Sequence, residues 1–147
     1  MRTSKLYAPL AYAGALPFVF CAVLLALGID SLPILGSVSL IAKTYSLAIV
    51  AFMSGSHWGT WQHVDNNAVP SLPIWSNGIT LAMWFALLLT PPAAASLVAG
   101  ACFSVLLGLD ARLRRLKVIS REYFSVRRNV SVVVMTSLLA MAYLEVV

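Results

Sequence analysis

Charged side chains are scarce in this sequence. Only 10% of its 147 residues are Asp, Glu, Lys or Arg, whereas 61% are hydrophobic. Soluble domains carry about a quarter charged residues, so the composition excludes an ordinary water-soluble protein. The mean hydropathy of +0.90 points the same way. Because no polar stretch is long enough for a separate soluble domain, we expect a single membrane domain over residues 1–147.

Cysteine and histidine are also rare, with two of each. Cys21 and Cys102 lie in apolar runs, which is typical of small hydrophobic residues and not of a disulfide framework. His57 and His63 point to different faces of one helix, so a haem would require a dimer. No His/Glu pair has the spacing of a metal site. We therefore predict no metal, no cofactor and no catalytic set, although sequence alone leaves an enzymatic role open.

Long apolar runs, by contrast, fill the chain. A helix needs about 20 apolar residues to cross a bilayer, and about 17 can suffice. Helix-breaking residues separate the runs, among them Pro33 after the first and Pro91 and Pro92 after the third. The pattern predicts an all-α, polytopic membrane protein. Its five transmembrane helices are expected over residues 7–29, 37–62, 72–89, 92–109 and 129–146.

Positive charge is gathered at one end of this predicted bundle. All Lys and Arg residues except Lys43 lie in the N-terminal tail or between the fourth and fifth spans, and four crossings place these two regions on the same side. By the positive-inside rule that side is the cytoplasm, so the C-terminus lies outside. Lys43, at the opposite end, is expected to extend its amine toward the interface.

The loop after the fourth span carries leucines at helical spacing, with basic residues between them. This predicts a basic amphipathic segment between the fourth and fifth helices that lies on anionic lipid headgroups. An alternative is that the charges only fix the topology. The candidate headgroup contacts are Arg112, Arg114, Arg115, Lys117 and Arg121.

Small residues four apart recur in the second and fourth spans. Such strips let two helices approach closely, so that dispersion holds them together. We therefore expect the second helix to pack on the fourth through these strips. The residues concerned are Ala51, Gly55 and Gly59 in the second span and Gly100, Ser104 and Gly108 in the fourth.

His57 is the most informative polar residue, because it lies at hydrocarbon depth in the second span. An ionisable side chain at that depth normally faces protein or a water-filled cavity and has a partner. Trp58 and Trp61, close by, are typical of the interfacial aromatic belt. The topology brings further polar groups to the same depth, so we predict a cluster that either binds a ligand or only pins helix ends together. The candidate ligand-binding residues are His57, Trp58, Trp61, Asn77, Asp110 and Arg127.

Three stretches of sequence suggest a family. They are "YAGALPF" in the first span, "AFMSGSHWG" in the second and "YFSVRR" before the last. Together they resemble the domain of unknown function 3429 family, which includes transmembrane protein 69-like proteins. The resemblance covers nearly the whole chain and implies a multi-span, basic membrane protein without an established activity. The Pro-x-Trp-Tyr pattern that family members tend to have before the last helix is not matched by "REYFSVRR".

Two functions remain open from the sequence. The first is a non-enzymatic scaffold, meaning an accessory or assembly subunit of a larger membrane complex or a homo-oligomer. The second is a binder or carrier of a small amphiphile, quinone-like or lipid, with the His57 cluster as the polar end of an apolar cleft. We expect anionic lipids as partners and no nucleic acid. Because no presequence precedes the first span, we expect a bacterial inner (cytoplasmic) membrane.

Overall fold

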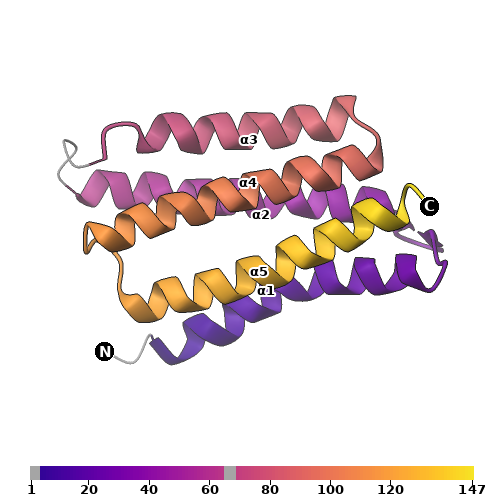
Figure 1. The fold of residues 1–147 in the computed structure, drawn as a ribbon, viewed down its shortest axis with the longest axis horizontal. Helices are drawn as coiled ribbons and strands as arrows, with labels where there is room; N and C mark the ends of the chain where they lie inside the picture. The colour runs from indigo at the N-terminus through magenta and orange to yellow at the C-terminus, as the bar shows by residue number, and fades with distance from the viewer. Residues whose placement is uncertain (1–3, 65–68) are drawn as a thin grey trace.

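A computed structural model describes residues 4–64 and 69–147 of the chain. These residues form five long helices and one very short β-hairpin, in the order given at the end of this paragraph. The helices lie side by side, each antiparallel to the one before it in the chain, and the hairpin joins the first two at one end (Figure 1). The elements are α1 (Ser4–Ala26), β1 (Ser31–Leu32), β2 (Gly36–Ser37), α2 (Val38–His63), α3 (Leu72–Leu89), α4 (Pro92–Arg115) and α5 (Arg121–Leu144).

The all-helical prediction is confirmed, and most helix bounds follow from the breaks seen in the sequence. α3 begins and ends at the predicted residues, with Pro73 in its first turn, where its missing N–H costs nothing. α1 ends earlier than predicted, because Gly28 has a φ of 73°. There the N–H of Ile29 donates to the carbonyl of Leu24 and that of Gly28 to Leu25, which is the Schellman arrangement that terminates helices.

Four of the five helices, α1 to α4, are long and apolar enough to cross a membrane, whereas α5 is not. The predicted fifth span, 129–146, overlaps α5 as far as Leu144, but this helix begins further back, in a polar stretch. Arg127, Arg128 and Asn129 lie within it, and the apolar part that follows ends at Leu144. That part is shorter than the about 18 residues usually read as a span.

The predicted amphipathic segment between the fourth and fifth helices is not a separate element. α4 does continue past residue 109, but it stops at Arg115. A short turn follows, in which Lys117 has a φ of 60° and the N–H of Val118 donates to the carbonyl of Leu113 at 2.9 Å. α5 then begins at Arg121, capped by the Ser120 hydroxyl. The basic residues are therefore divided between the end of α4 and the start of α5.

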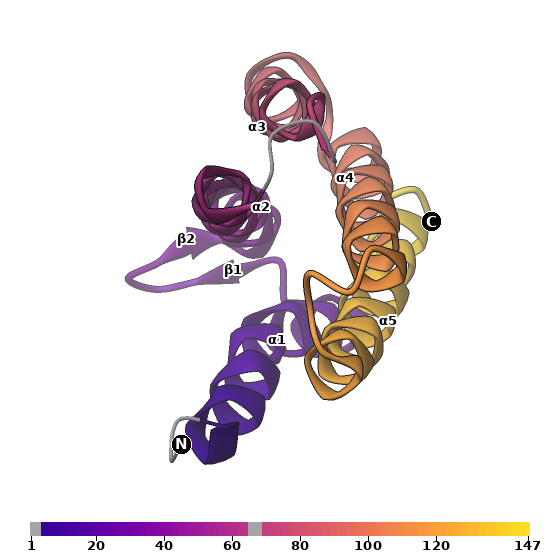
Figure 2. The same ribbon diagram turned by 90° about the vertical axis from the view of Figure 1, so that its left-hand side faces the viewer.

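The helices do not surround one central axis evenly. α4 packs against α2, α3 and α5, while α1 packs against α5 and α2. Seen along the helices, α3 lies at the edge furthest from α1 (Figure 2). All five helices contribute to the main core, with Phe18, Val50, Met83, Phe103 and Leu138 among its buried side chains.

The second and fourth helices do pack on each other, but the glycines of the small-residue strips do not lie in a close contact. Gly55, Gly59 and Gly108 are exposed, and a Cβ added at any of these glycines would meet nothing within 4 Å. α2 instead presents a different stripe to the core, with Ala42, Ser46, Val50, Met53, Ser54 and His57 buried. A pattern of small residues does not by itself tell which face of a helix points inward.

Candidate functional site

A buried ion-pair network joins three helices near the basic end of the bundle. Asp110 of α4 lies between His57 of α2 and Arg127 of α5, and we call these three residues the triad. His57 is 2% exposed and Asp110 3%. The sequence placed these residues at a similar depth, and the helix packing brings them into contact.

Each oxygen of the Asp110 carboxylate has its own partner. The imidazole Nε2 of His57 lies 2.9 Å from Oδ1, so in the neutral tautomer that fits this contact Nε2–H donates to the carboxylate. Nε of Arg127 donates to Oδ2 at 2.9 Å, and Nη2 approaches the same oxygen at 2.8 Å. A buried charge is tolerated when it is paired and hydrogen bonded in this way.

The triad has unused hydrogen-bonding capacity. Among the described residues, Nδ1 of His57 has no hydrogen-bond partner. The buried hydroxyl of Ser54, one turn before His57, has none either. Ser54 and His57 therefore do not form the hydrogen bond that a Ser-His-Asp nucleophile requires. Within the described residues, no group of three or more His, Cys, Asp or Glu side chains could hold a metal ion.

An apolar cleft opens beside the triad, and Arg127 forms part of its wall. The cleft has a volume of about 410 Å³, which lies in the range of small-molecule sites, about 300–1,000 Å³. It runs between α1, α2 and α5, with Phe103 of α4 also lining it. Its other residues are Tyr7, Leu10, Ala11 and Gly14 of α1, Ile49, Phe52, Met53 and Ser56 of α2, and Tyr123, Val130, Ser131 and Val134 of α5.

The two ends of this cleft differ in character. At the basic end, the rings of Tyr7 and Tyr123 stack with centroids 4.8 Å apart, and the buried Tyr7 hydroxyl has no hydrogen-bond partner among the described residues. Towards the other end, the hydroxyl of Tyr45 donates to the carbonyl of Gly14 at 2.9 Å and ties α2 to α1. Phe18 packs on Tyr45 at that point. The cleft is thus polar at one end and closed by an aromatic contact at the other.

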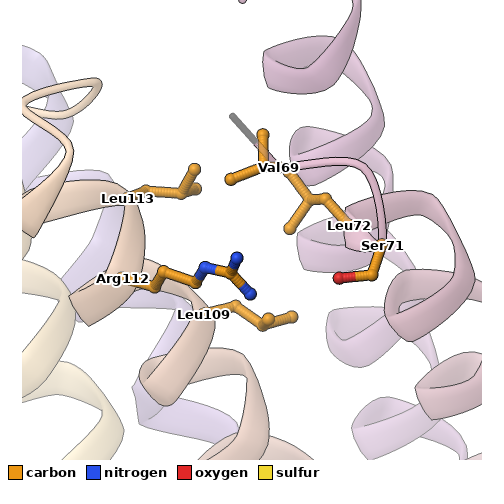
Figure 3. Close-up of a pocket in the computed structure, with 6 residues that line it drawn as sticks. All are labelled: Val69, Ser71, Leu72, Leu109, Arg112 and Leu113. Atoms are coloured by element: carbon orange, nitrogen blue, oxygen red, sulfur yellow. The ribbon is translucent and has the colours of Figure 1, made fainter. Parts of the chain in front are cut away.

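The remaining predicted site residues lie away from the cleft. Nε1 of Trp58 donates to the Asn77 side chain at 3.1 Å, a link between α2 and α3 outside the triad. Trp61 stacks edge-on against Trp58 and packs on Leu113. Arg112 borders a small hollow between α4 and the residues before α3 (Figure 3). That hollow measures only about 10 Å³, about enough for one water molecule.

Other basic residues contact a helix end or line a surface groove. Lys43 donates from Nζ to the carbonyl of Thr90 at 2.9 Å, so it caps the C-terminal end of α3. Arg114, Arg115 and Arg121 lie together in a surface groove between α4 and α5. Sequence reasoning missed Tyr7, Tyr123 and the whole α1 wall of the cleft, because tyrosines in apolar helices carry no motif.

The family comparison agrees with the resemblance found in the sequence. A profile of the DUF3429 family, described as a protein of unknown function, matches residues 3–143. The chain belongs to the DUF3429 family. No curated protein and no solved structure matches it.

In this DUF3429 protein the three stretches that carry the resemblance come together in space. The stretch over residues 12–18 contributes Gly14 to the cleft wall, and that over 51–59 contributes His57 to the triad and most of the α2 wall of the cleft. The stretch over 123–128 contributes Tyr123 and Arg127. Two residues of the triad and part of the cleft wall therefore come from those three stretches.

Proposed function

We propose that this protein binds a membrane amphiphile in the cleft between α1, α2 and α5. The observation that carries the proposal is the cleft itself, an apolar space of about 410 Å³ that ends at Arg127 and Tyr7. An apolar chain fits its wall, which consists largely of Leu, Ile, Phe, Met and Val. A headgroup that accepts hydrogen bonds fits the polar end.

The charge balance narrows the kind of headgroup. Arg127 is already paired with Asp110, so a ligand need not carry a full negative charge. The donors at this end of the cleft are the Tyr7 hydroxyl, which has no hydrogen-bond partner among the described residues, and the N–H groups of the Arg127 guanidinium beyond those directed at Asp110. A carbonyl of a quinone-like molecule, or an ester or phosphate oxygen of a lipid, would satisfy them. Because Asp110 already holds the Arg127 side chain in position, a ligand could bind without a large structural change.

We further propose that all five helices cross the membrane. α5 packs beside α4 and α1 along the bundle, and it extends from one end to the other (Figure 1). Its arginine-bearing first turns would then lie at the cytoplasmic interface. This places the N-terminus in the cytoplasm of a bacterial cell and the C-terminus on the outer side of the inner membrane.

Blocking the cleft tests the proposal directly. Ala11→Trp fills the cleft, whereas Ala13→Trp adds the same volume on the exposed side of α1. We expect the wild-type protein and Ala13→Trp, purified in mild detergent, to retain an apolar molecule that solvent extraction and mass spectrometry identify. Ala11→Trp should retain much less of it. Equal retention by both variants would contradict the proposal.

A second test addresses the headgroup. Tyr7→Phe removes one hydroxyl from the polar end, and Tyr12→Phe removes one from an exposed position on the same helix. Loss of one hydrogen bond is worth about 0.5–1.5 kcal/mol, or about 2–10-fold in affinity. We expect this weakening for Tyr7→Phe alone, measured with a short-chain quinone and with a single-chain phospholipid as probes. No difference between the variants would place the headgroup elsewhere.

A scaffold role is the second candidate, and one observation favours it. Ala51, Gly55 and Gly59 form a strip of small residues on the exposed face of α2, where an added Cβ at either glycine meets nothing within 4 Å. A helix of a larger complex could pack closely there. Co-purification of a partner that Gly55→Leu releases and Ala11→Trp does not would support this function.

A further inference from the structure

Four arginines border one groove at the basic end of the bundle. The groove lies between the end of α4 and the start of α5 and measures about 480 Å³. Arg114 and Arg115 come from α4, and Arg121 and Arg128 from α5, with Phe124 and Ser125 also lining it. Among the described residues, none of these four arginines forms a salt bridge with a carboxylate.

The backbone around the groove is fixed, so the four charges are held together. The turn between the helices is closed by the bond from Val118 N–H to the Leu113 carbonyl. The start of α5 is capped by Ser120, whose hydroxyl accepts from the Tyr123 N–H at 3.1 Å. Unpaired like charges repel one another. An anion bound in the groove would relieve the repulsion among these four guanidinium groups, three of which are exposed.

The position of the groove indicates where this anion comes from. Only Asn129 separates Arg128 from the apolar part of α5, so, with α5 crossing the membrane as proposed above, the groove would lie at the level where that part enters the bilayer. Phe124 offers an apolar surface in the same groove, which suits the glycerol and first methylene groups of a lipid better than a freely soluble ion. Basic pockets beside membrane helices on the cytoplasmic side are typical sites for anionic headgroups.

The number of arginines indicates the charge of the headgroup. A lipid with one phosphodiester brings one negative charge, which leaves most of the guanidinium charge uncompensated. Arginine binds phosphate through two parallel N–H···O bonds, and each helix supplies one pair of arginines. We propose that this groove binds the headgroup of a lipid that carries two phosphate groups, one at the α4 pair and one at the α5 pair.

This site is separate from the cleft, and the proposal does not rest on the amphiphile proposed above. Arg127 and Arg128 are consecutive, yet the first borders the cleft and the second the groove. The groove site also goes beyond a general attraction of basic residues to anionic membranes. It predicts discrimination between lipids by their number of phosphates.

The test uses the full chain in detergent and native mass spectrometry. The probes are cardiolipin, with two phosphates, and phosphatidylglycerol, with one. Arg121→Gln/Arg128→Gln removes two charges from the groove, and Arg112→Gln/Lys117→Gln removes two charges from outside it. We expect cardiolipin to bind the wild-type protein at least about tenfold more tightly than phosphatidylglycerol, since each basic residue contributes about fivefold. Only the groove variant should lose this preference.

Three results would overturn the proposal. They are equal affinity for the two lipids in the wild-type protein, equal loss in both variants, and displacement of cardiolipin by inorganic pyrophosphate at similar concentration. The last would identify a site for a soluble polyanion. Because the exchanged arginines are surface residues, folding is checked by helical circular dichroism. If the double variant does not fold, the single variants Arg128→Gln and Lys117→Gln are compared, each of which removes one charge, the first from the groove and the second from outside it.

Discussion

His57 and Asp110 join α2 to α4 through a contact of 2.9 Å between the imidazole Nε2 and the carboxylate Oδ1. Both side chains are almost entirely buried. Because Arg127 holds the other carboxylate oxygen, Asp110 is the shared acceptor where α2, α4 and α5 meet. Removing it would leave a buried guanidinium without its counter-charge. The triad is therefore expected to support the fold whether or not the cleft is occupied.

Asp110→Ala tests this expectation. Breaking a buried ion pair by removing one partner costs about 3–5 kcal/mol, so the free energy of unfolding should fall by that amount. Asp30→Ala is the control, since Asp30 is exposed in the connection between α1 and α2. Thermal unfolding of both variants in the same detergent gives the comparison. Similar melting temperatures would show that the triad contributes little.

The two histidines provide a second comparison within α2. His57→Leu leaves Oδ1 of Asp110 without its donor, and an unsatisfied buried group costs about 1–3 kcal/mol. His63 is exposed, and its Nδ1 lies 2.7 Å from the Gly59 carbonyl of its own helix. His63→Leu should therefore stay within about 0.5 kcal/mol of the wild-type protein. Chemical unfolding monitored by tryptophan fluorescence would measure both, and equal effects would contradict the prediction.

Tyr45 is expected to keep the closed end of the cleft in place. Tyr45→Phe removes its bond to the Gly14 carbonyl while preserving the ring that packs on Phe18. The free energy of unfolding should fall by about 0.5–1.5 kcal/mol. Tyr143→Phe, at an exposed position, is the matched control and should change nothing. A Tyr45→Phe protein as stable as its control would mean that this bond does not hold α1 to α2.

Much of the helical layout could be predicted because it depends on local signals. Prolines and polar breaks set the bounds of α3, and the depth of each polar residue along its span put His57, Asp110 and Arg127 near one another. The observed helix ends differ from the predicted ones where the local backbone conformation determines them. α1 stops before Gly28 because of its Schellman turn, and α4 passes its predicted end because its last arginines are good helix formers.

The cleft and the packing faces could not be predicted in this way. The cleft depends on how α1 lies, since this helix packs more extensively on α5 than on α2, and nothing in the hydropathy of these helices sets that lateral position. The strip at Ala51, Gly55 and Gly59 was assigned to the interior, although it faces outward. In a membrane helix both faces are apolar, so small residues indicate where a close contact is allowed and not that one is made.

Gly28 and Gly55 give a last prediction, in which the structure reverses what the small-residue strip suggests. Gly28 has a φ of 73°, a conformation that costs other residues about 1–2 kcal/mol, so Gly28→Leu should lower the free energy of unfolding by about that amount. Gly55 is helical with open space beside it, and Gly55→Leu should be neutral or slightly stabilising because leucine favours helices by about 0.5–1 kcal/mol over glycine. Melting temperatures of the two variants in one detergent decide the order. If Gly55→Leu proves the more damaging, then α2 has a close partner on its exposed face, and this result would favour the scaffold function.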